Sequence, residues 1–250
     1  MADRPRRDDW WLASDGKWYP PELASGGSVP TPDATAPRTA VPSRLTVAAS
    51  IALGVTSVLF VVSGFFGLRV ASDLRSGVTS TIGSREATTS EIAFGGWLSF
   101  SFAAFAVAAV LVIVWIFSSS RSLDARGATH RRWRGGWIVG GWLIPLANLV
   151  IPKLLVNELE KGLQVPYRSA PITDSWKTET RTTVADVWWL SWVGGVVVGQ
   201  VASVTGSAEG ASDAAVAAGI TLASIALLLF AIAGVCLLLV IRRMETFSKR

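Results

Sequence analysis

The sequence has little charge, one cysteine and one histidine. Charged residues make up 16% of its 250 residues, against about 25% in ordinary soluble domains. The single cysteine, Cys236, excludes a disulfide within the chain, and the single histidine, His130, excludes a site built from several imidazoles. This composition is typical of a membrane protein, because a bilayer tolerates few ionised side chains.

Groups that carry out chemistry are also missing from the apolar stretches of the chain. These stretches contain no Asp, Glu, His, Lys or Arg, so general acid–base catalysis inside a bilayer lacks its usual side chains. The sequence has no cluster of metal ligands, no Gly-rich phosphate loop and no nucleophile beside a base. We therefore expect a protein that is not an enzyme and that holds no cofactor and no metal.

The chain has a net charge of +5, but its basic residues gather at the ends of apolar stretches. Cytoplasmic flanks of membrane helices and contacts with anionic lipid explain such a distribution. No basic stripe or nucleic-acid-binding motif accompanies the charge. We therefore expect the lipid bilayer as a partner, and no nucleic acid.

The apolar residues are concentrated in a few long stretches. A spanning helix needs about 18 or more consecutive apolar residues, and four stretches exceed that length. The sequence thus predicts an all-α membrane protein, with a polytopic domain over 44–243 and a basic tail over 244–250. The four predicted transmembrane helices cover about 45–68, 93–118, 187–206 and 215–241.

A fifth apolar stretch belongs to the segment 135–160 and is broken by two prolines. Pro145 cannot continue the hydrogen bonding of a helix, and it disfavours helical geometry at the preceding residue. Asn148 falls between Pro145 and Pro152, where freed backbone groups need internal partners. Two interpretations stay open: the segment crosses the membrane as a fifth span, or it forms a re-entrant or interfacial pair of helices.

Further features of this segment predict its contacts. Gly136 and Gly140 lie four residues apart, a spacing that lets a neighbouring backbone approach. The residues after Pro152 have the pattern of an amphipathic helix at the membrane interface. Leucines occupy one side of that helix, and its polar residues are Lys153, Asn157, Glu160 and Lys161.

The distribution of positive charge favours the re-entrant interpretation. If the segment returns to the side from which it enters, most of the 23 Lys and Arg residues lie in the same compartment as both termini. If it crosses, the basic residues divide almost evenly between the two sides. Because cytoplasmic loops are enriched in Lys and Arg, we expect four spans with the N- and C-termini in the cytoplasm.

Tryptophans and small residues indicate how the spans are placed. Trp97 and Trp115 are separated by about the thickness of the hydrocarbon core, so we expect one in each aromatic belt. Gly195 and Gly199 have the spacing of a helix-packing face, and homo-oligomerisation through such faces is a further possibility. Gln200 is the one strongly polar residue of its span. It predicts a hydrogen bond between helices or, as the rarer use, the lining of a path.

The N-terminal residues 1–23 form a Trp-rich motif. Asp15 and Gly16 stand between two aromatic runs, which is a signal for a β-hairpin. The motif resembles the WW-x-ASDGKWYPPE segments of actinobacterial membrane proteins. Residues 24–43 are rich in Pro, Ala, Thr and Gly and predict a disordered linker. The candidate partner-binding residues of the motif are Trp10, Trp11, Trp18 and Tyr19.

The broken segment and its flanks carry a characteristic set of residues, which are Arg132, Arg134, Trp137, Gly141, Trp142, Ile144, Pro145, Asn148 and Pro152. With these residues the chain, from about residue 45 to 241, resembles the actinobacterial integral membrane proteins of "domain of unknown function 4328". The resemblance implies architecture and lineage only. We expect a multi-pass protein of the bacterial cytoplasmic (inner) membrane.

Two functions remain open. The first is a non-enzymatic scaffold or adaptor that recruits a protein partner through residues 1–23. The alternative is a small-solute transporter or channel component that uses the proline-broken segment, since transporters expose backbone groups near the middle of the membrane at such breaks. The candidate polar or hinge residues inside the membrane are Pro145, Asn148, Pro152 and Gln200.

Overall fold

The computed structural model describes residues 11–12, 18–19, 43–78, 88–133, 135–165, 172, 174–206 and 211–248. The chain divides into two compact units, Met1–Thr39 and Ala40–Arg250. In the first unit, β1 (Trp11–Leu12) pairs with β2 (Trp18–Tyr19) in antiparallel register, with Trp11 opposite Tyr19. The rest of the predicted hairpin, with Trp10, and the predicted linker up to residue 42 lie outside the described residues.

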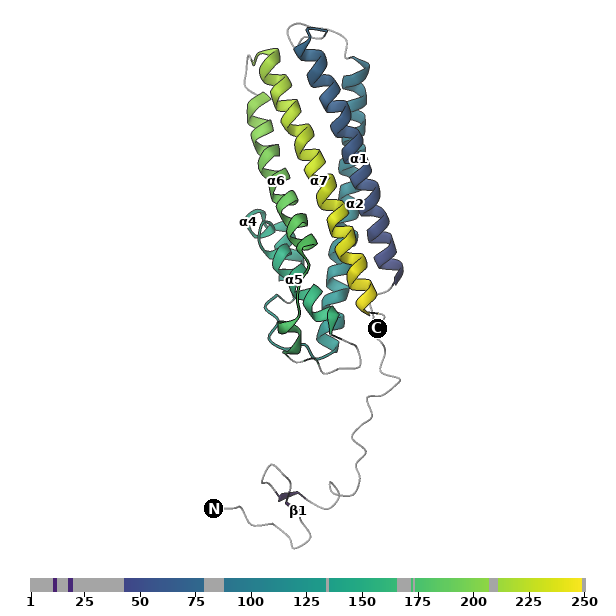
Figure 1. The fold of residues 1–250 in the computed structure, drawn as a ribbon, viewed down its shortest axis with the longest axis vertical. Helices are drawn as coiled ribbons and strands as arrows, with labels where there is room; N and C mark the ends of the chain where they lie inside the picture. The colour runs from purple at the N-terminus through teal and green to yellow at the C-terminus, as the bar shows by residue number, and fades with distance from the viewer. Residues whose placement is uncertain are drawn as a thin grey trace. The chain divides into compact units, whose positions relative to one another are not determined.

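The described residues of the second unit include four long helices, which run roughly parallel to one another in Figure 1. Each is long and apolar enough to cross a membrane, so the prediction of four spans in an all-α membrane domain is confirmed. They are α1 (Ser43–Arg75), α2 (Thr89–Ala125), α6 (Thr183–Gly206) and α7 (Asp213–Ser248).

These helices extend beyond the apolar stretches from which they were predicted, because polar contacts continue them. Thr88 caps the start of α2 in a capping box with Glu91. Arg75, in the last turn of α1, donates a 2.6 Å hydrogen bond to Thr221 of α7. Residues 244–248, predicted as part of a basic tail, continue α7, and Met244 is buried.

The long helices pack in the order α2, α1, α7, α6. Close approach of α6 and α7 depends on Gly195, because a Cβ there would lie 2.6 Å from the ring of Phe230. At the two ends of this order, Phe105 of α2 stacks on Trp192 of α6 with ring centroids 5.8 Å apart. The helices therefore enclose space between α2 and α6, which aromatic side chains partly fill.

Polar side chains tie neighbouring spans together. Ser63 of α1 and Ser101 of α2 share a 2.8 Å hydrogen bond. The indole nitrogen of Trp115 donates to the hydroxyl of Thr46 at 3.0 Å, and Trp115 exposes 2% of its surface. Trp115 was predicted for an aromatic belt, but it lies in the protein interior because its indole has a partner on α1.

Between α2 and α6 the described residues include four short helices. They are α3 (Trp137–Leu143), α4 (Pro145–Asn148), α5 (Ile151–Gln164) and the 3₁₀ helix η3 (Ser175–Thr178). We call residues 126–133, 151–165 and 174–182 the α5 lobe. The lobe lies at the end of the bundle where α2 and α7 finish and α6 begins (Figure 1).

Candidate functional site

The broken helix lies where the sequence predicts it. Ile144 is extended, with φ −84° and ψ 120°, so α3 stops there and Pro145 begins α4 as its first residue. Pro152 likewise stands in the first turn of α5, where a missing N–H costs nothing. At the two breaks, the prolines start helices and do not bend one continuous helix.

The segment turns back on itself after the break. A Cβ on Gly141 of α3 would lie 2.5 Å from Cγ2 of Ile151, so α3 and α5 meet at this glycine. The predicted approach at Gly136 and Gly140 is wrong, since a Cβ at either position would meet no atom within 4 Å. With seven residues, α3 is about 10 Å long, far short of a bilayer. The four spans found among the described helices do not include it.

Much of the polar side of α5 is buried. Of the four polar residues predicted there, Lys153 and Glu160 are buried, with Glu160 exposing none of its surface, and Asn157 and Lys161 are half-buried. Its apolar side also packs inward, where a Cβ on Gly162 would lie 2.6 Å from Leu123 of α2. The amphipathic pattern therefore reflects two kinds of buried contact, apolar on one side and ionic on the other.

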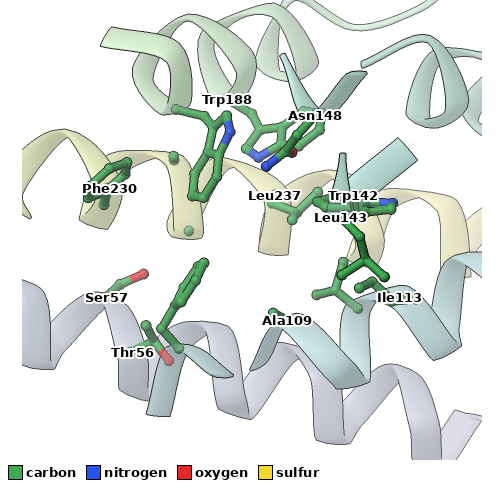
Figure 2. A pocket seen from close by; sticks show the side chains of 15 residues that line it. Thr56, Ser57, Ala109, Ile113, Trp142, Leu143, Asn148, Trp188, Phe230 and Leu237 are labelled. Atoms are coloured by element: carbon green, nitrogen blue, oxygen red, sulfur yellow. The ribbon is translucent and has the colours of Figure 1, made fainter. Parts of the chain in front are cut away.

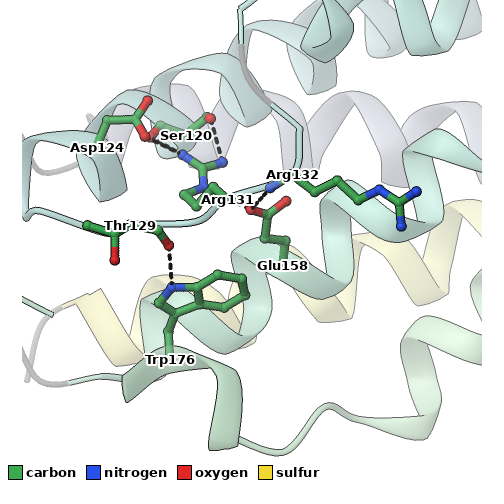
Figure 3. A network of polar contacts seen from close by, with 7 residues as sticks. All are labelled: Ser120, Asp124, Thr129, Arg131, Arg132, Glu158 and Trp176. Atoms are coloured by element: carbon green, nitrogen blue, oxygen red, sulfur yellow. Dashed lines mark hydrogen bonds and ion pairs between the residues drawn. The ribbon is translucent and has the colours of Figure 1, made fainter. Parts of the chain in front are cut away.

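Arg131 forms the main ionic contact of the lobe (Figure 3). Its side chain donates to the carboxylates of Glu158, at 3.3 Å, and of Asp124, at 2.9 Å. It also donates to the backbone oxygen of Ser120 at 2.8 Å and to its hydroxyl at 2.6 Å. The backbone N–H of Arg132 adds a 3.2 Å bond to Glu158. One guanidinium thus joins the end of α2 to the middle of α5.

Two further ion pairs connect α5 to the spans that follow it. The ammonium of Lys153 lies 2.7 Å from Asp186 in the first turn of α6. Glu160 accepts a 3.0 Å hydrogen bond from the backbone of Thr182 and lies 3.8 Å from Arg243 of α7. Burial raises the pKa of Glu160 above its ordinary value and lowers the pKa of Lys153, while their ionic partners act in the opposite direction.

The loops of the lobe are held by hydrogen bonds to backbone oxygens. Arg126 donates to Val165, and the indole of Trp176 donates to Thr129 at 3.3 Å. His130, which has a positive φ of 55°, pairs with Asp174 at 3.0 Å. The side chain of Asp174 therefore binds the neighbouring loop and does not cap η3. Each buried charged residue in the described part of the chain belongs to this lobe. Arg126, Arg131, Glu158 and Glu160 have hydrogen-bond partners, and Lys153 has an ionic partner in Asp186.

A cavity of about 240 Å³ lies beside the broken helix, inside the bundle (Figure 2). α1, α2 and α7 supply much of its wall, and the start of α6 together with α3 and α4 supplies the rest. Leu143 and Asn148 flank the break and both line the cavity. The aromatic residues of the wall are Phe105, Trp142, Trp188, Trp192 and Phe230.

The polar groups beside this cavity are incompletely bonded. Oδ1 of Asn148 and Nε1 of Trp142 are buried, and neither has a hydrogen-bond partner in the described part of the chain. The hydroxyl of Thr56, across the cavity on α1, is also buried without one. By contrast, the indole of Trp189 donates to the backbone of Leu149 at 2.9 Å, which fixes the turn between α4 and α5 to α6.

The other predicted site residues lie away from this cavity. Gln200 is exposed on α6, and the described residues give its side chain no hydrogen bond to another helix. The pairing of β1 and β2 includes Trp11, Trp18 and Tyr19, and Trp10 lies outside the described residues. Among the described residues, no group of three or more His, Cys, Asp or Glu side chains is arranged to hold a metal ion.

The sequence pattern did not reveal the ionic core of the lobe. The available signal was a cluster of arginines before the broken segment and the two carboxylates Glu158 and Glu160 at its end. Matching the two groups requires knowing that the segment turns back, which places residue 131 beside residue 158. The pairing of these charges could therefore be predicted only together with the direction that the chain takes after the proline break.

No curated protein and no solved structure matches the chain. Residues 79–246 match the family described as Domain of unknown function (DUF4328). The matched region begins after α1 and contains the α5 lobe, the broken helix, α2, α6 and all of α7 except its last two residues. The predicted resemblance began near residue 45, so the match places its start further along the chain. Because it spans more than half of the sequence, this chain belongs to the DUF4328 family.

Proposed function

We propose that the protein is a non-enzymatic scaffold or adaptor of the bacterial cytoplasmic membrane, with both termini in the cytoplasm. The single observation that supports it is the arrangement of charge in the α5 lobe. The five charged side chains that are buried in the described part of the chain are engaged in contacts that hold the lobe together. Such contacts make a rigid body at the membrane surface, and they leave these side chains little freedom for chemistry.

The recruiting element in this proposal is the N-terminal motif. Its two strands pair in a unit separate from the membrane domain, and a hairpin this small is marginal without a partner. Aromatic residues are the side chains most enriched at the centres of protein interfaces. A protein partner that covers Trp11, Trp18 and Tyr19 would stabilise the strands and gain contact area.

Co-purification in mild detergent tests this role. The full chain is compared with a full-length variant in which Trp10, Trp11, Trp18 and Tyr19 are replaced by serine, so that the linker and membrane domain stay unchanged. Proteins retained by the native chain and lost with the variant support recruitment. Identical sets of retained proteins from both chains would refute it, provided that both are present in the membrane in equal amounts.

A second candidate is small-solute transport past the broken helix, which the cavity beside Asn148 favours. Reconstituted vesicles loaded with a panel of uncharged solutes would test it. Replacement of Asn148 by alanine is expected to change a flux that the matched Asn157→Ala variant leaves intact, because Asn157 lies on α5 away from the cavity wall. Equal flux through both variants and the native chain would exclude this use of Asn148.

A further inference from the structure

The cavity between α2 and α6 has the character of a ligand site. The described residues of its wall include no charged side chain, and they combine five aromatic with several aliphatic side chains. An ion placed there would have no partner for its charge, which costs several kcal/mol or more in an apolar environment. The wall therefore selects against charged molecules and favours an apolar body.

The polar groups at the wall indicate which functional group the ligand carries. Buried polar atoms without a partner are rare in native proteins, because each costs free energy comparable to a lost hydrogen bond. Here the amide of Asn148 is held at the wall by the turn of α4, with its buried oxygen unpartnered. Across the cavity, Ser57 has its hydroxyl proton engaged with Leu53 and keeps lone pairs free to accept. A hydroxyl group can both donate and accept, so it can pair with either edge of the amide.

The volume indicates the size of the body that the cavity can surround. An apolar protein cavity of about 150 Å³ holds benzene, with six carbon atoms. By simple proportion, 240 Å³ holds an apolar body of about ten non-hydrogen atoms. We propose that this cavity binds an uncharged amphiphile of about that size, whose hydroxyl group forms a hydrogen bond with Asn148. This binding is separate from the scaffold role and needs neither a protein partner nor transport.

Tryptophan fluorescence offers a direct test, since Trp142, Trp188 and Trp192 line the cavity. The full chain in lipid nanodiscs is titrated with 8-bromooctan-1-ol and, separately, with 1-bromooctane. Both carry the same quenching bromine, but only the first carries a hydroxyl. Tryptophans that face the lipid, such as Trp97, give quenching that rises without saturation for both probes. We expect an additional saturable component, with roughly fivefold tighter binding of the alcohol.

Two leucine substitutions separate binding from folding. In Asn148→Leu the alcohol and the bromoalkane are expected to bind with about equal affinity. Asn157→Leu also removes a buried amide oxygen without a partner, and it is expected to retain the native preference for the alcohol. Unchanged thermal unfolding midpoints show that both variants fold. Equal saturable binding of the two probes by the native chain would show a cavity that merely accepts lipid tails and would overturn the proposal. Absence of any saturable component, or an unaltered preference in Asn148→Leu, would overturn it as well.

Discussion

The guanidinium of Arg131 lies 3.3 Å from the carboxylate of Glu158, and these two side chains expose 1% and 6% of their surface. They are separated by the whole broken helix, so their pairing closes the loop that contains α3 and α4. A buried pair of this kind contributes little to stability compared with apolar residues of equal size. Loss of one partner is strongly destabilising, because the other is then left buried, charged and unpaired.

Replacement of Arg131 by methionine should therefore destabilise the membrane domain by about 3–5 kcal/mol. The measurement is the free energy or midpoint of unfolding in mild detergent. Arg132→Met is the matched control, because Arg132 is exposed and contacts Glu158 through its backbone N–H, which the substitution retains. Similar decreases in unfolding free energy for the two variants would show that loss of the buried ion pair does not destabilise the protein more than loss of an exposed arginine.

The neighbouring residues Gly140 and Gly141 of α3 should respond differently to replacement by alanine. Gly141→Ala places a methyl group 2.5 Å from a methyl group of Ile151 and should cost about 1–3 kcal/mol through overpacking. Gly140→Ala meets open space and should have no cost or a small gain, since alanine favours a helix. Thermal unfolding of both variants checks the order, and a more damaging change at 140 would contradict the contact between α3 and α5.

The buried carboxylates predict a pH dependence. Burial raises the folded-state pKa of Glu160 above its ordinary value of 4.5, and that of Glu158 likewise. Between the ordinary and the raised pKa, the folded protein binds more protons than the unfolded chain, so stability rises as the pH falls through this window and is lost as the pH rises. Glu160→Gln should flatten this part of the stability profile. Unfolding midpoints recorded from pH 4.5 upward provide the check, and a slope of opposite sign would refute the assignment.

The predicted orientation can be tested with two cysteines in a Cys236→Ser background. Thr178 and Ser76 are both exposed, in η3 and just beyond α1, at opposite ends of the bundle. In intact cells an impermeant thiol reagent should label Ser76→Cys and leave Thr178→Cys unlabelled until the membrane is permeabilised. Labelling of the cysteine at 178 from outside would place the α5 lobe on the wrong side for the proposed scaffold.

Hydropathy was sufficient for the four long helices because a bilayer demands long uncharged stretches, and proline chemistry was sufficient for the breaks at Pro145 and Pro152. Contacts between elements were harder to predict. The spacing of Gly136 and Gly140 fits a packing face, but the direction of the turn after Ile144 brings Gly141 to α5. The direction of this turn depends on the tertiary structure, which the spacing of glycines in the sequence does not predict.

The expected exposure of two sets of side chains was wrong for a related reason. A helix with one polar side is expected at a membrane surface when its polar residues face water. In α5 they face Arg131, Asp186 and Arg243, which come from three distant parts of the chain. Trp115 has the spacing of an interfacial residue, but the hydroxyl of Thr46 accepts its N–H inside the bundle. In both examples the side chains are buried because their partners come from distant parts of the sequence.

The contact of Glu160 with Arg243 also sets the order in which the protein can be completed during synthesis. Arg243 lies near the end of the chain, and at about 5–20 residues per second it is made several seconds after Glu160. Until then the lobe has α2 to pack against but lacks α7, and Glu160 lacks its cationic neighbour. A chain that stops short of Arg243 therefore leaves the buried carboxylate of Glu160 without this cation.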